Sequence, residues 1–237
     1  MTTRHGDAPG ELDHLAVLVD LQTTFLATIP EVDPTTRVPW CGDWRVEDLI
    51  VHLADIHHWA AAQARRQEET PLGRGPFVLT DLYRSCATEL RETLLELDPD
   101  APSWTLVGDG PASFWRRRQT HETLVHLWDL RTAGGLELTV DPVLWADTVD
   151  EVVTVMQPRQ ERLGRMEPLP APVALHATDA DREWLLGGDG QPAVRVHGTA
   201  SDLALLLWGR RTPDDDGLRV DGDRAALDDA LSRRLTP

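Results

Sequence analysis

The first two-thirds of the chain place apolar residues at intervals of three and four, which is the spacing of amphipathic helices. Asp141 and Pro142 suit the N-cap and first turn of the last such helix, which Pro158 is expected to kink or end. Short or Pro/Gly-rich connections between the helices predict an up-and-down bundle. Five segments show the helical pattern: 11–29, 45–67, 79–97, 116–135 and 141–163.

The periodicity changes after the Pro-rich segment 167–173. Beyond it, short runs alternate apolar and polar residues as half-buried strands do, and two helical patterns are interspersed among them. Such a mixture predicts a small α+β domain. We therefore expect an α+β protein of two domains, with a helical bundle over residues 1–166 and a C-terminal domain over residues 167–237.

Composition and charge argue against several classes of partner. The formal net charge is −17, and nucleic acids and anionic membranes both attract basic surfaces instead. All 23 basic residues are Arg, so the chain has no Lys for a Schiff base or a P-loop. The longest strongly apolar run, LALLLW, is too short to span a membrane, and the N-terminal residues lack the apolar core of a signal peptide. We expect a cytoplasmic protein.

Segment 116–135 carries candidate metal ligands in its middle. Glu122 and His126 are four residues apart, so they lie on one helix face, about 40° from each other. Such a pair can share a divalent metal, and Asp129 can orient an imidazole from one turn further on. The same spacing also arises by chance on exposed helix faces, and Asp129 can instead pair with Arg131.

His52 is the candidate third ligand, because apolar residues flank it within the second helical segment. A histidine there must find a hydrogen-bond partner in the core or ligate something. A core role is the commoner of the two. His57 and His58 face elsewhere on the same helix, and His121 lies about 140° round the helix from His126.

A substrate carboxylate would need a cation, and Arg suits bidentate carboxylate binding. Arg116, Arg117 and Arg118 precede the candidate ligands, and Arg210 and Arg211 follow LLLWG in the C-terminal domain. Most of these side chains are expected to pair with the abundant surface Asp and Glu. Arg210 is the candidate for the substrate, provided that the C-terminal domain closes over the bundle.

Three motifs resemble those of one known family. VPWCGDWRVEDLIVHLADIHHWA (38–60) resembles C-x-x-W-T-V-x-D-L-x-x-H-L, the first signature of the mycothiol-dependent maleylpyruvate isomerase family, within the DinB-like bundle superfamily. FWRRRQTHETLVHLWDLRTAGG (114–135) resembles its second signature, arginines followed by H-E-T-x-x-H-x-W-D. VRVHGTASDLALLLWGRRTPDDDGLRVDGD (194–223) is similar to its sterol-carrier-like C-terminal module. The resemblance covers most of the chain in the expected order.

The resemblance implies a divalent metal, usually zinc, held by His52, Glu122 and His126. It also implies mycothiol as co-substrate, a low-molecular-weight thiol that such a site activates as a metal-bound thiolate for attack on a small electrophile. The enzyme would be a cis–trans isomerase of the maleylpyruvate type or a thiol S-transferase. Arg45 stands where the family has Ser or Thr, which are good N-cap residues. We therefore expect Asp43 to serve as the N-cap of this helix.

The alternative is a non-catalytic small-molecule binding protein whose metal is structural or absent. Cys41 and Cys86 are expected to be structural, so the chain itself would not supply the thiol. The natural electrophile is not encoded in these patterns, and the protein is expected to be a monomer or a homodimer.

Overall fold

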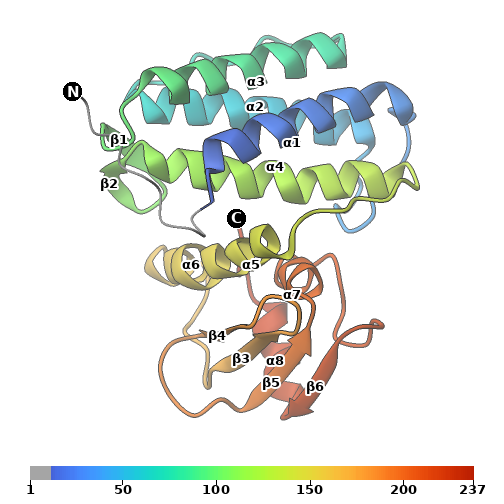
Figure 1. Ribbon diagram of the computed structural model, residues 1–237, viewed down its shortest axis with the longest axis vertical. Coiled ribbons are helices and arrows are strands. Elements are labelled where there is room, and N and C mark those ends of the chain that lie inside the picture. Colours follow the sequence, from blue (N-terminus) through green and yellow to red (C-terminus); the bar gives the residue numbers. More distant parts are fainter. Residues whose placement is uncertain (1–11) are drawn as a thin grey trace, which may run out of the picture. The chain divides into compact units, whose positions relative to one another are not determined.

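The computed structural model describes residues 12–237 and divides into two compact units (Figure 1). Residues 12–38 and 43–136 form the first unit, and the short segment 39–42 joins residues 137–237 in the second. A helical part is followed by an α+β part, which confirms the expected fold class. No helix among the described residues is long and apolar enough to cross a lipid bilayer.

The first unit is a bundle in which α1 and α2 each pack against both α3 and α4 (Figure 1). Its helices are α1 (His14–Thr28), α2 (Val46–Ala64), α3 (Leu79–Glu96) and α4 (Ser113–Ala133). The apolar faces meet in a core that includes Leu18, Ala60, Ala61, Ala64, Leu90, Leu94 and Trp115. A 3-10 turn (Ile29–Glu31) follows α1. An antiparallel hairpin of β1 (Pro102–Thr105) and β2 (Gly108–Pro111), which the sequence did not predict, precedes α4.

Helix α2 begins differently from the expectation. Asp43 forms an ion pair with Arg37 at 2.8 Å, so the prediction that Asp43 caps the helix was wrong. Arg45 occupies the N-cap position, and its backbone N–H donates to Oδ2 of Asp48 at 2.8 Å. A carboxylate in the third helical position thus closes the first turn from inside the helix. This turn sets the start of the helix that carries His52.

The second unit begins with α5 (Pro142–Glu151), whose N-cap Asp141 accepts a hydrogen bond from the Val143 N–H at 2.9 Å, as predicted. Pro158 does not end the helical path. A π-helical turn (Val152–Met156) leads into α6 (Gln157–Arg162), where Pro158 lies in the first turn.

The units divide after residue 136, whereas the change of periodicity suggested a boundary near residue 167. The physical reason is packing, because α5 packs against α7 (Ala200–Leu207) of the second unit. Helical periodicity indicates that a helix has a buried face, but it does not indicate which unit covers that face.

The second unit also contains a four-stranded sheet in the order β4-β3-β5-β6 (Figure 1). Strands β3 and β5 are parallel, and the other two pairings are antiparallel. Alternate residues of β5 are buried, as the strand pattern predicted, and α8 packs against β3 and β5. The elements are β3 (Val173–Ala177), β4 (Arg182–Leu186), β5 (Val194–Gly198), β6 (Arg219–Gly222) and α8 (Arg224–Ser232).

Candidate metal centre

Two helices of the bundle bring the three predicted ligands together. Glu122 and His126 lie one turn apart on α4, and His52 comes from α2, which packs against α4. Oε1 of Glu122 is 3.2 Å from Nε2 of His126 and 3.6 Å from Nε2 of His52. One ligand atom from each residue lies within 4.8 Å of the other two. The predicted convergence across helices is therefore present in the fold.

The cluster is buried on one side and accessible on the other. The side chains of Glu122 and His126 are 10% and 6% exposed, whereas that of His52 is 32% exposed. The ring of Trp44 lies against the His52 ring, with 4.8 Å between centroids, and the His52 and His126 rings meet edge to face at 5.1 Å. A ligand from solvent would therefore approach the cluster past His52.

Asp129 lies beside His126, as the sequence suggested. Its Oδ2 is 2.9 Å from Nδ1 of His126, and the carboxylate is fully buried. A carboxylate there accepts a hydrogen bond from Nδ1–H, which leaves the Nε2 lone pair directed toward Glu122 and His52. Arg131, the alternative partner suggested for Asp129, donates to Oγ1 of Thr28.

Arg118 occupies a place that the sequence reasoning missed. It was grouped with the arginines that could bind a substrate or surface carboxylates, but its side chain is only 3% exposed. Its Nη2 donates to Oε2 of Glu122, one turn further along α4. The signal was available in the sequence, because Arg118 and Glu122 have the same four-residue spacing as Glu122 and His126.

The remaining bundle histidines have other partners. Nδ1 of His57 lies 2.8 Å from Oε1 of Gln119 on α4, while its Nε2 is buried without a hydrogen-bond partner. Complete burial lowers the pKa of His57 to about 4, against the opposing effect of the Gln119 hydrogen bond. His58 contacts Glu89 at 2.6 Å, and His121 meets the His14 ring edge to face at 5.9 Å.

The other candidate arginines have varied surroundings. Arg210 belongs to the second unit, where it donates to the Trp208 carbonyl and lies 3.5 Å from Sγ of Cys41. Arg211 pairs with Asp202 at 3.0 Å, as expected of an arginine in so acidic a chain. A substrate role for Arg210 stays a prediction.

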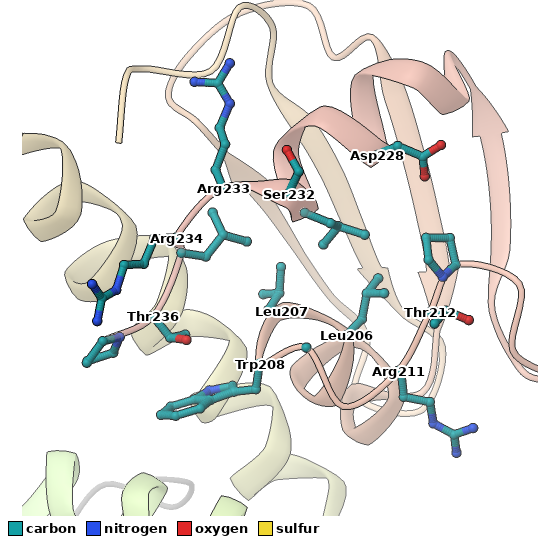
Figure 2. Close-up of a pocket in the computed structure, with 15 residues that line it drawn as sticks. Leu206, Leu207, Trp208, Arg211, Thr212, Asp228, Ser232, Arg233, Arg234 and Thr236 are labelled. Carbon is teal, nitrogen blue, oxygen red and sulfur yellow. The ribbon is translucent and has the colours of Figure 1, made fainter. Parts of the chain in front are cut away.

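A separate cavity of about 440 Å³ lies within the second unit (Figure 2). Leu206, Leu207 and Trp208 at the end of α7 face the segment after α8 across it. Arg233 lines the cavity but is held by Asp229 at 2.9 Å and by the Glu167 carbonyl at 2.7 Å. Arg211 is the one candidate arginine in the lining, and none of the three predicted metal ligands lines the cavity.

The donor set of the bundle cluster suits a divalent metal. Two imidazole nitrogens and one carboxylate oxygen, with a further position left open, are one of the usual compositions of a catalytic zinc site. The polar atoms of the two α4 ligands that do not face the metal position also have hydrogen-bond partners: Asp129 for Nδ1 of His126 and Arg118 for Oε2 of Glu122. Support of this kind is typical of metal sites, so these residues fit a bound metal.

Fold and cluster together define a two-part protein with a candidate metal centre in its N-terminal helical bundle. Two family models match the chain: the mycothiol maleylpyruvate isomerase N-terminal domain over residues 16–131 and the MDMPI C-terminal domain over residues 144–229. The chain therefore belongs to the mycothiol-dependent maleylpyruvate isomerase family, as its motifs suggested.

Solved structures lead to the same fold. The chain is similar to a crystal structure of the mycothiol-dependent maleylpyruvate isomerase, with 18% identity and a TM-score of 0.64 over 89% of this chain and 93% of that one. A histidine-to-alanine mutant of that enzyme matches with the same identity and coverage and a TM-score of 0.63. No curated protein matches the sequence.

Proposed function

We propose that the protein is a metal-dependent enzyme that uses a low-molecular-weight thiol, mycothiol, to isomerise a small electrophile of the maleylpyruvate type. The observation that carries the proposal is the convergence of two imidazole nitrogens and one carboxylate oxygen within 4.8 Å in the bundle. Membership of the family supports the choice of thiol and substrate class. We also propose a cytoplasmic location, where thiols are kept reduced.

His52, Glu122 and His126 would hold the metal, and Asp129 would keep His126 in the tautomer whose Nε2 can coordinate. When bound, a divalent cation such as zinc favours the thiolate form of a thiol over the neutral form. Partial exposure of His52 leaves a path by which thiol and electrophile can reach the cluster. Membership of the family supports a thiol from outside the chain, and burial makes Cys86 a poor nucleophile.

The reaction of a thiolate with maleylpyruvate accounts for isomerisation. The sulfur adds to one carbon of the cis double bond, the remaining single bond rotates, and elimination of the thiolate leaves the trans double bond. The thiol is regenerated in each cycle. With a halide or an epoxide the same attack would end in a stable thioether, which is the S-transferase reaction.

The test is metal content and thiol-dependent turnover of the purified protein, before and after chelation. We expect about one zinc per chain, turnover of maleylpyruvate only with mycothiol present, and loss of both in His52→Ala with the fold retained. His58→Ala is the matched control, because His58 lies on the same helix and contacts Glu89 instead of the cluster.

Recovery of the thiol unchanged would identify an isomerase, and a thiol adduct in the product would identify an S-transferase. A wild-type protein that takes up no metal, even from added zinc, would overturn the proposal. A metal whose removal unfolds the bundle, without any thiol-dependent turnover, would favour the non-catalytic binding protein instead.

A further inference from the structure

Arg118 is a buried cation whose charge is compensated by one ligand of the candidate metal centre. Its side chain is 3% exposed, and its Nη2 donates to Oε2 of Glu122. A buried guanidinium is costly unless it is paired and hydrogen-bonded. The contact therefore defines the position of both side chains.

The two oxygens of Glu122 have different partners. Oε1 faces the candidate metal position, 3.2 Å from Nε2 of His126 and 3.6 Å from Nε2 of His52. Oε2 accepts the hydrogen bond from Arg118. A metal-binding carboxylate can use one oxygen or both, and a chelating carboxylate would occupy one further coordination position.

We propose that Arg118 is a positioning residue that restricts Glu122 to coordination through Oε1 alone. The inference rests on the proposed function, because it concerns how that metal would be held. A guanidinium on Oε2 withholds this oxygen from the metal and leaves a coordination position for the thiol. A charge-assisted hydrogen bond is strong enough to fix the rotation of a carboxylate.

The sequence of α4 makes this arrangement local. Arg118, Glu122, His126 and Asp129 follow one another at intervals of four, four and three residues, so their side chains lie along one face of the helix. Each of the two ligands has its supporting residue on the same helix, one on either side of the pair. Only His52 must come from another element.

The direct test is a crystal structure of the wild-type protein loaded with zinc. We expect Oε1 of Glu122 on the metal and Oε2 still hydrogen-bonded to Arg118, outside the coordination sphere. Both oxygens on the zinc would overturn the inference while leaving the metal site intact. Failure to bind zinc would instead refute the proposed function, so the two failures are distinguishable.

Variants test the consequence for the thiol. In Arg118→Gln and Arg118→Met, loaded with cobalt(II), Glu122 should chelate, which raises the coordination number and weakens the visible absorption band. Thiol-dependent activity should fall roughly 10–100-fold, the usual effect of losing a residue that supports a metal ligand, and the loss should show as a higher KM for the thiol. Arg116→Met is the control, because Arg116 on the same helix donates to the Leu94 and Leu97 carbonyls instead.

A simple loss of packing in these variants would lower the melting temperature without changing the cobalt spectrum. Spectra of both Arg118 variants that superimpose on the wild type would therefore overturn the inference. If neither variant folds, the zinc-loaded wild-type structure still decides between one and two bound oxygens.

Discussion

His57 should make the apo bundle less stable in mild acid by an amount that can be worked out. Burial lowers the pKa of its imidazole from the ordinary 6.5 to about 4. The unfolded chain therefore binds a proton at pH 5 that the folded chain refuses. The contribution of His57 to the free energy of unfolding therefore has its full value above pH 6.5 and decreases as the pH falls toward 4. Linkage gives a loss of about 2 kcal/mol between pH 7.5 and pH 5.

The assay is urea unfolding of chelator-treated protein at these two pH values. Asn in place of His57 can still donate to Oε1 of Gln119 but does not titrate, so His57→Asn should reduce the pH dependence by about 2 kcal/mol. Partial burial alone would lower the pKa of His58, but hydrogen bonds to Glu89 and to the Thr70 carbonyl outweigh it and raise this pKa. His58 therefore stabilises the fold at low pH, and the control His58→Asn should steepen the pH dependence. Equal pH dependence in wild type and His57→Asn would refute the reasoning.

Three further predictions follow from buried or crowded positions. Asp129→Asn should weaken zinc binding about 10–100-fold in competition with a chromophoric chelator, and unaltered affinity would contradict its role. A Cβ on Gly134 would meet Cγ2 of Val32 at 2.6 Å, so Gly134→Ala should lower the free energy of unfolding in urea by about 1–3 kcal/mol; an unchanged midpoint would count against this packing. Burial raises the pKa of the Cys86 thiol to about 11, so at pH 8 a thiol reagent should modify the half-buried Cys41 quickly and Cys86 only on unfolding; two fast thiols would contradict this.

The local part of the candidate site could be predicted from the sequence, because helix geometry alone brings residues four apart together. Glu122, His126 and Asp129 are adjacent in the structure for that reason. The position of His52 depends on how α2 packs on α4, which spacing does not encode. Its apolar neighbours made it a candidate ligand, and the family motifs supported that choice. Arg118 had the right spacing but was interpreted as a surface or substrate cation, since charged residues are rarely buried.

Local geometry was harder to predict where competing contacts decide it. The hairpin β1–β2 has strands of four residues each, too short to show an alternating pattern. Asp43 has the right chemistry for a helix cap, but Arg37 attracts it elsewhere. Pro158 was expected to disturb its helix, and the preceding π turn accommodates it within a continuing helical path.

The distribution of the ligands over two helices also determines when the site can form during folding. Glu122 and His126 become neighbours as soon as α4 is helical, whereas His52 stands 70 residues before Glu122. Closing that long segment has an entropic cost that the docking of α2 must first overcome. In a refolding experiment, the moment at which the protein first binds metal tightly would therefore report when the bundle assembles. The ring centroid of Trp44 lies 4.8 Å from that of His52, so tryptophan fluorescence can follow the same step.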